Sequence, residues 1–206
     1  MANNEQETEA KFYVRDLKRI ETRLQDLGAH LVQSRVLEKN IRFDLPDARL
    51  RSERRVLRLR RDTEARLTYK GANTNKQGVL SRTEIEFIVE NFEKAKLFLE
   101  ALGYQPVFYY EKYRTTSELD GTLIMLDELP YGNFVEIEGE TIESIRQVSD
   151  ALNLNWDAAI GASYHALFLY VCKTLDLSFQ DLSFENFAGI QVTPTDLSVH
   201  AATELP

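Results

Sequence analysis

The chain has 206 residues, of which 25 are Lys or Arg and 33 are Asp or Glu, so its formal net charge is −8. This acidic balance argues against a general nucleic-acid binder, because phosphate backbones attract basic surfaces. Apolar residues make up 43% of the chain and charged residues 28%, which is typical of a folded globular protein, and the length favours one domain.

Cellular location is constrained by three features of the sequence. The single cysteine, Cys172, excludes an internal disulfide and fits a reducing compartment, and its apolar neighbours indicate core packing. No apolar stretch approaches the roughly 18 residues that a membrane span needs. The N-terminus has neither a basic segment nor an apolar core for secretion. We therefore expect a soluble, cytoplasmic protein that has no membrane partner.

Hydrophobic periodicity predicts a series of strands interrupted by a few helices. Residues 7–14 are expected to form a strand, and residues 15–27 an amphipathic helix that ends at Gly28. Extended segments are then predicted at 35–43, 56–61, 66–70, 81–89, 107–119, 122–128 and 133–138. Helices are predicted at 92–102, 142–152 and 158–175, a loop at 45–54, and a turn or mobile loop at 71–78.

This order indicates an α+β fold, because strands follow one another in runs and a mostly antiparallel sheet results. Seven or eight strands are enough for the sheet to curl or close into a barrel, with the helices packed outside. We expect a single domain over residues 1–188, C-terminal helices included. Residues 189–206 contain no Lys or Arg and little periodicity, so a flexible tail is expected there.

Charge is unevenly distributed along the chain. Residues 35–76 hold 13 Lys or Arg and 6 Asp or Glu, whereas residues 117–206 hold 2 and 15. A solvated basic loop beside an acidic surface would explain this distribution simply. The spacing of the charges within the predicted strands suggests another explanation.

Charged residues, and in one case the polar Thr68, recur at every second position of six predicted strands, so they share one face of each strand. The sets are Glu7, Glu9 and Lys11; Arg58 and Arg60; Arg66, Thr68 and Lys70; Arg82, Glu84 and Glu86; Lys112 and Arg114; and Glu136 and Glu138. The interleaved positions are largely apolar. These charged faces would either form the wet side of an open sheet or, if the sheet closes, line a lumen in which the two signs neutralise each other.

The charges that line such a lumen indicate which ligand it would bind. Arg and Lys bind phosphate oxygens, and clustered carboxylates bind hard cations such as Mg²⁺ or Mn²⁺, which in turn bridge polyphosphate oxygens. Together, the two kinds of side chain indicate a metal-bound triphosphate.

The same residues form a set of ordered motifs. They are ETEAK at 7–11, LRLR at 57–60, LTYKG at 67–71, RTEIE at 82–86, KYR at 112–114, LD at 126–127 and GNFVEIE at 132–138. In this order, the motifs resemble those of the CYTH superfamily, or triphosphate tunnel metalloenzymes. Its members include class IV adenylate cyclases, thiamine triphosphatases and inorganic triphosphatases. The resemblance spans about two thirds of the chain.

The resemblance implies an eight-stranded antiparallel barrel that forms an open tunnel, with Mg²⁺ or Mn²⁺ as the cofactor. The implied phosphate ligands are Lys11, Arg58, Arg60, Lys70, Arg82, Lys112 and Arg114. The implied metal ligands or their neighbours are Glu7, Glu9, Asp127, Glu136 and Glu138, with Glu84 and Glu86 either at a second metal or paired with cations.

One position departs from the family pattern. The sequence NIRFD at 40–44 places Arg42 where members often carry a tyrosine, in a pattern like D-x-Y-F-D. A mechanism or substrate preference that depends on that tyrosine hydroxyl therefore does not carry over.

The leading hypothesis for function is metal-dependent hydrolysis of inorganic triphosphate or of a nucleoside or thiamine triphosphate. Lys112 or Lys70 would act near the scissile bond, and Glu9 would help to activate water. The alternative is a cyclase that converts ATP to cyclic AMP and diphosphate, and a third hypothesis is a non-catalytic polyphosphate-binding module. The expected partner is a triphosphate-containing small molecule, and both a monomer and a homodimer remain open.

Three histidines, His30, His165 and His200, show no ligand spacing. We interpret them as structural or solvent-exposed residues.

Overall fold

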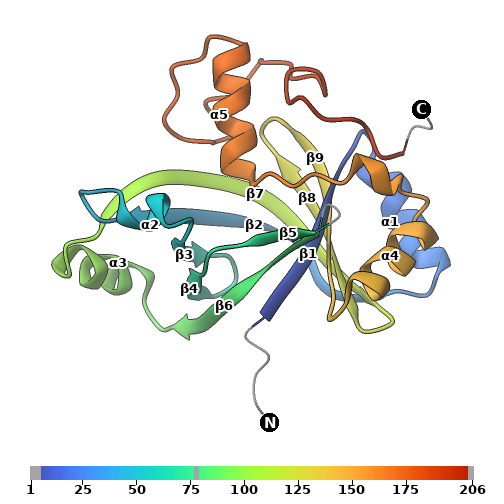
Figure 1. Ribbon diagram of the computed structural model, residues 1–206, viewed down its shortest axis with the longest axis horizontal. Coiled ribbons are helices and arrows are strands. Elements are labelled where there is room, and N and C mark those ends of the chain that lie inside the picture. Colours follow the sequence, from blue (N-terminus) through green and yellow to red (C-terminus); the bar gives the residue numbers. More distant parts are fainter. Residues whose placement is uncertain (1–5, 77–78, 204–206) are drawn as a thin grey trace.

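The computed structural model describes residues 6–76 and 79–203 (Figure 1). The strands within these ranges are β1 (Gln6–Val14), β2 (His30–Asp44), β3 (Val56–Arg61), β4 (Ala65–Lys70), β5 (Thr74–Lys76), β6 (Val79–Val89), β7 (Gln105–Leu119), β8 (Thr122–Leu129) and β9 (Gly132–Glu138). The helices are α1 (Leu17–Asp26), α2 (Arg49–Ser52), α3 (Phe92–Ala101), α4 (Ile142–Ala151) and α5 (Tyr164–Thr174), with a 3₁₀ helix, η1 (Trp156–Ala158).

Eight of the strands close into an antiparallel barrel. The sheet order is β1-β9-β8-β7-β2-β3-β4-β6, and β6 pairs back with β1 through Glu7↔Arg82 and Thr8↔Ser81. The short strand β5 adds to β6 outside this ring. The predicted α+β class and the eight-stranded antiparallel barrel are therefore confirmed.

Strand β2, which is as long as β7, begins at His30, earlier than the predicted residue 35. Its pairing with β7 shifts register between Leu31 and Gln33 and again between Gln33 and Val36. Each shift interrupts the period-2 alternation, which explains why the sequence pattern did not reveal this part of the strand.

Three other predicted segments differ in detail. The loop predicted at 45–54 contains the single-turn helix α2, and the turn predicted at 71–78 contains β5, although its residues 77–78 lie outside the described ranges. The helix predicted at 158–175 begins at Tyr164. The backbone N–H of Ile160 donates to the carbonyl of Lys11 on β1 at 2.7 Å, so this stretch stays extended until Ser163 caps α5.

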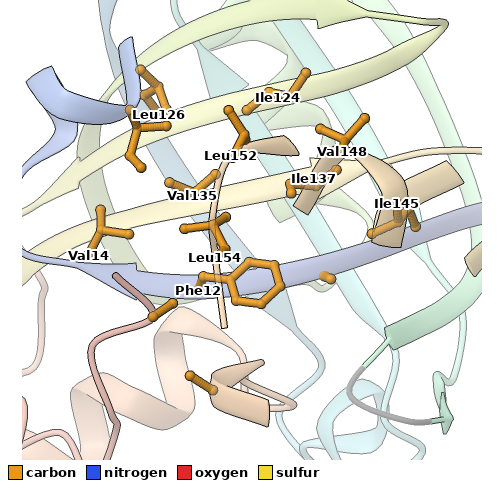
Figure 2. Packing of buried hydrophobic residues seen from close by; sticks show 14 of the residues in the cluster. Phe12, Val14, Ile124, Leu126, Val135, Ile137, Ile145, Val148, Leu152 and Leu154 are labelled. Atoms are coloured by element: carbon orange, nitrogen blue, oxygen red, sulfur yellow. The ribbon is translucent and has the colours of Figure 1, made fainter. Parts of the chain in front are cut away.

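Apolar side chains cover the outside of the barrel. Figure 2 shows Phe12, Val135 and Ile137 of the strands packing with Ile145 and Val148 of α4, and Ile20 and Leu24 of α1 belong to the same cluster. A second cluster places α5 against Tyr13, Phe134 and neighbouring aromatic residues. A third places α3 against β2 and β3 through Phe43, Leu59 and Leu99. The helices therefore pack on the outside of the barrel (Figure 1), although Ile85 and Phe87 of β6 stay exposed there. The charged face is left to the interior.

The C-terminal segment, for which the sequence predicts a flexible tail at 189–206, packs on the barrel over its described part, 189–203. The backbone N–H of Ala202 donates to the carbonyl of Tyr13 at 2.9 Å, and Ala201 bridges to Tyr13. Leu197 is only 1% exposed within the α5 cluster. Apolar residues spaced too irregularly to indicate a helix or strand thus anchor the segment.

Among the helices that the structure describes, none combines the length and the hydropathy of a transmembrane span.

We predict that Leu197→Ala lowers the free energy of unfolding by about 2 to about 5 kcal/mol, because it leaves a cavity in a packed cluster. The matched control is Leu169→Ala on α5, whose side chain is 45% exposed, with an expected change within about 0.5 kcal/mol. Urea denaturation measures both variants. Equal costs for the two would mean that the segment does not pack on the barrel in solution.

Candidate active site

The interior of the barrel holds a cavity of about 500 Å³ that side chains from all eight barrel strands and from the start of α5 line. Its size is ordinary for a small-molecule site, but its lining is unusually charged. The lining Lys and Arg residues are Lys11, Arg42, Arg58, Arg60, Arg66, Lys70, Arg82, Lys112 and Arg114. The lining glutamates are Glu7, Glu9, Glu38, Glu84, Glu86, Glu136 and Glu138.

The structure thus brings together all seven of the predicted phosphate ligands and six of the seven predicted carboxylates. The exception is Asp127, which is fully buried behind the lining. Its oxygens accept hydrogen bonds from Lys112, Arg114 and the hydroxyl of Tyr164.

Glu7 is the centre of one ion-pair cluster, at the junction of β1 with β6. Its Oε1 accepts from Lys70 Nζ at 2.6 Å, and its Oε2 accepts from Arg82 Nε at 2.7 Å. Lys70 Nζ also lies 2.8 Å from Glu84. Burial alone would raise the pKa of Glu7, but the charges of Lys70 and Arg82 outweigh it and hold that pKa well below its ordinary value.

Asp127 is the centre of a second cluster. Arg114 donates two hydrogen bonds to its carboxylate, from Nε and from Nη2, each 2.6 Å long. Arg114 Nη2 also donates to Glu136. Lys112 Nζ lies 2.8 Å from Asp127, and Lys11 Nζ lies 2.8 Å from Glu136. These contacts hold the two ammonium groups and the guanidinium in fixed positions at the lumen wall.

Tyr164 packs against this second cluster from α5. Its hydroxyl donates to Asp127 at 2.8 Å, while its ring lies 4.4 Å from Lys11 Nζ and 5.1 Å from Lys112 Nζ. The ring therefore supports both ammonium groups through cation–π contact.

Arg60 and Glu86 organise the wall formed by β3, β4 and β6. Arg60 bonds Glu38 at 3.2 Å and Glu86 at 3.0 Å, and Thr68 donates to Glu86 at 2.7 Å. Glu38 is almost fully buried. Burial would raise its pKa, but Lys112, Arg114 and Arg60 lower it to about 2, so Glu38 is a permanent anion of the wall.

Glu138 differs from the other lumen carboxylates. Among the described residues it has no ion pair within 4.0 Å, and it lies near Glu7, Glu9 and Glu84. Burial, followed by repulsion from Glu7, Glu84 and Glu9, raises the pKa of Glu138 to about 7. A carboxylate that lacks a counterion and faces three other carboxylates is a suitable donor for a divalent cation.

The chemistry of these four glutamates therefore fits Mg²⁺ or Mn²⁺, although no ready-made group of three metal-ligating side chains occurs within residues 6–76 and 79–203. Lys70 already pairs with Glu7 and Glu84. The ion pairs of Glu9 within the part of the chain that the structure describes are long, 3.7 Å to Lys11 and 3.9 Å to Arg82. Metal binding would require some of these carboxylates to leave their present partners.

Sequence reasoning missed several lining residues. Glu38 and Arg42 share one face of the predicted segment 35–43, but the charged Lys39 falls on its other face, so the charges of this segment do not alternate cleanly. Tyr164 and His165 come from the first turn of α5, where strand alternation gives no signal. The expectation that His165 is a structural or surface residue is thus incomplete, because it lines the cavity.

The chain matches one known sequence family. The sequence model of the CYTH domain matches residues 5–159, a stretch that contains every barrel strand and ends before α5. No curated protein shows significant sequence similarity to the chain.

Several solved structures share the fold. A protein of Pyrococcus horikoshii OT3 is 24% identical, with 77% of this chain and 96% of that chain covered and a TM-score of 0.65. A candidate adenylate cyclase of Vibrio parahaemolyticus is 18% identical, with 81% and 99% covered and a TM-score of 0.74. A candidate adenylyl cyclase of Hippeastrum, whose dominant activity is that of a triphosphatase, is 19% identical, with 79% and 95% covered and a TM-score of 0.61.

We predict that Glu138→Gln stabilises the metal-free protein more at about pH 8 than at about pH 5. The pKa of Glu138 is about 7 in the folded chain against an ordinary value of 4.5, so the folded state binds more protons within that window. Stability is therefore lost as the pH rises through the window, and a neutral amide removes that loss.

Thermal unfolding in chelator at the two pH values measures this difference. Glu118→Gln, on an exposed position of β7, is the control. A Glu138→Gln effect that is independent of pH would show that Glu138 has no raised pKa.

Proposed function

Since the chain belongs to the CYTH family, we propose that it is a divalent-metal-dependent hydrolase that cleaves a phosphoanhydride bond of a triphosphate bound in the barrel lumen. The observation that carries this proposal is the lumen lining, in which nine Lys or Arg and seven Glu face one cavity of about 500 Å³. A bare metal would leave the cations unused, and a bare anion would be repelled by the glutamates. A triphosphate with its metal uses both sets.

Binding is an exchange of partners within the lumen. In the ligand-free barrel, Lys70 and Arg82 neutralise Glu7, and Lys11 neutralises Glu136. Phosphoryl oxygens offer these cations new partners, and a divalent metal does the same for the carboxylates. Because both exchanges occur together, no buried charge is left without a partner, which would be costly.

The substrate-binding role falls to the cations that the sequence motifs identify. Arg58, Arg60 and Arg114 are guanidinium groups that can hold phosphoryl oxygens bidentately. Lys70 and Lys112 supply point charges toward the bridging and departing oxygens, where negative charge grows during cleavage. Asp127 does not contact the cavity and acts as a positioning residue for Lys112 and Arg114.

The metal would be held by Glu7, Glu9, Glu84 and Glu138, and when bound it would polarise a phosphoryl oxygen and lower the pKa of the attacking water. Among the described residues Glu9 has only long ion pairs, so its carboxylate is available to orient that water and accept its proton. Water oxygen forms the new P–O bond, the phosphoanhydride P–O bond breaks, and the shortened polyphosphate leaves while the lumen cations neutralise it.

Cyclisation of ATP is a second candidate, because the fold is shared with the Vibrio parahaemolyticus candidate adenylate cyclase. The Hippeastrum protein, also a candidate cyclase by name, has a dominant triphosphatase activity. That precedent, together with a lining in which charged side chains outnumber apolar ones, favours hydrolysis.

We predict that Glu7→Gln, Glu9→Gln and Lys112→Gln each lower kcat/KM for tripolyphosphate by about 10²-fold to about 10³-fold. Each removes a charge that contacts metal or substrate while keeping the side-chain size similar. Phosphate release with Mg²⁺ and with Mn²⁺ measures the effect. The controls are Lys96→Gln and Glu100→Gln, an ion pair on α3 outside the lumen. Activity retained in all three lumen variants would refute the site.

We also predict that ATP yields ADP and phosphate without cyclic AMP. Chromatographic product analysis in Mg²⁺ and Mn²⁺ decides this. Cyclic AMP with diphosphate would establish the cyclase instead. Tight binding of tripolyphosphate without any product over several hours would establish a non-catalytic binding module.

A further inference from the structure

Asp127 differs from the glutamates of the site because it has no access to the cavity. Its side chain is 0% exposed and does not line the lumen, whereas Glu7, Glu84 and Glu138 do. A divalent metal in the lumen can therefore take the place of an ammonium group on those glutamates, but not on Asp127. Since a buried carboxylate without partners is highly unfavourable, Asp127 must keep hydrogen-bond donors that belong to the protein itself.

Three side chains donate to Asp127 among the described residues, and the proposed function assigns two of them to the substrate. Lys112 Nζ lies 2.8 Å from Oδ2, and Arg114 donates to both oxygens at 2.6 Å. Both cations line the lumen, so the phosphoryl groups of a bound substrate would draw them away from Asp127. Their departure would remove both counterions from a fully buried carboxylate.

Tyr164 supplies the third donor, and it is the neutral one. Its hydroxyl donates to Asp127 Oδ2 at 2.8 Å. Because the phenol carries no charge, a phosphoryl oxygen attracts it less strongly than an ammonium or a guanidinium group. Other contacts hold the residue in place: its carbonyl accepts from the Tyr131 hydroxyl at 2.9 Å, and its ring packs edge-on against Phe134, with 5.2 Å between the centroids. Tyr164 can thus remain on Asp127 when the cations move.

The C-terminal part of the chain, rather than the barrel, provides this donor. The CYTH model matches residues 5–159 and ends before α5, whose first residue is Tyr164. Ser163 caps the helix by accepting from the backbone N–H of Ala166 at 3.2 Å, which fixes where the helix begins. The segment beyond the matched barrel therefore contributes a side chain to the candidate site.

We propose that Tyr164 is a positioning residue that allows Lys112 and Arg114 to leave Asp127 for the phosphates of the substrate, because its hydroxyl remains as a donor to the buried carboxylate. This inference rests on the proposed function and specifies how partners are exchanged on the side of the lumen that a metal does not reach. Without the hydroxyl, each cation that turns to the substrate would leave Asp127 with one donor fewer, and ligand binding would weaken.

Tyr164→Phe isolates the hydroxyl, because phenylalanine keeps a ring beside Lys11 and Lys112. The probe is bis(methylene)triphosphate, a triphosphate analogue whose P–C–P links cannot be hydrolysed. We expect the variant to bind it in Mg²⁺ about fivefold to about hundredfold more weakly than the wild type does, the range for a buried acceptor that loses a donor. Calorimetry measures the dissociation constants, and kcat/KM for tripolyphosphate should fall by a similar factor.

The matched control is Tyr131→Phe, which removes another buried tyrosine hydroxyl of the same apolar cluster. Tyr131 is 1% exposed and donates to the carbonyl of Tyr164, not to Asp127. Each variant loses one buried hydrogen bond, so both should lower the thermal midpoint of the ligand-free protein by similar amounts. Only Tyr164→Phe should weaken binding, with a change of less than about threefold for Tyr131→Phe. A purely structural role of Tyr164 would make the two variants alike in both measurements.

A double-mutant cycle with Lys112→Met tests whether the hydroxyl acts through the cation. In that background no ammonium group leaves Asp127 when the analogue binds. Tyr164→Phe should therefore weaken binding by a smaller factor than it does in the wild type. Fully additive losses would show that Tyr164 does not act through Lys112.

Equal dissociation constants for the wild type and Tyr164→Phe, or equal weakening by Tyr131→Phe, would overturn the role of Tyr164. If the wild type binds the analogue but hydrolyses no triphosphate, the hydrolase proposal fails, and the dissociation constants still decide the role of Tyr164. A wild type that does not bind the analogue would overturn both proposals.

Discussion

Lys70 and Arg82 both donate to the carboxylate of Glu7, and these two ion pairs join β4 and β6 to β1 at the seam where the barrel closes. Charges enclosed by a barrel lose most of their hydration, so each requires an opposite charge or a ligand inside it. The closed sheet meets that requirement because seven of the eight barrel strands present charged side chains to the lumen, whereas β8 lines it with Leu123 and Met125. The apolar faces then lie outside, where α1, α4, α5 and α3 pack on them, except at β6, whose Ile85 and Phe87 stay exposed.

The same requirement is the basis of the proposed function. Its ion pairs neutralise the lumen but remain exchangeable, because phosphate can replace a carboxylate on a guanidinium and a metal can replace an ammonium on a carboxylate. Glu138 lacks such a partner among the residues described and faces other glutamates. It is a position where a cation would bind without first displacing anything.

How much of this the sequence predicts depends on how regular each strand is. Arg58 with Arg60 and Glu136 with Glu138 occur in strands with uninterrupted alternation, and the structure places all four in the lumen. The first residues of β2 were missed because two register shifts break the alternation. Tyr164 and His165 reach the lumen from a helix end, and the segment around Leu197 packs without any periodicity. Such placements depend on tertiary packing, which local pattern does not encode.

Co-crystallisation with tripolyphosphate and Mn²⁺ tests the exchange of partners most directly, since anomalous scattering locates the metal independently of the ligand. The account predicts phosphoryl oxygens on the lumen Lys and Arg residues and a manganese peak between Glu138 and the neighbouring glutamates of β1. It also predicts that Lys70 and Arg82 separate from Glu7. Tripolyphosphate bound outside the barrel, or a lumen in which the ion pairs of the free protein persist unchanged, would contradict it.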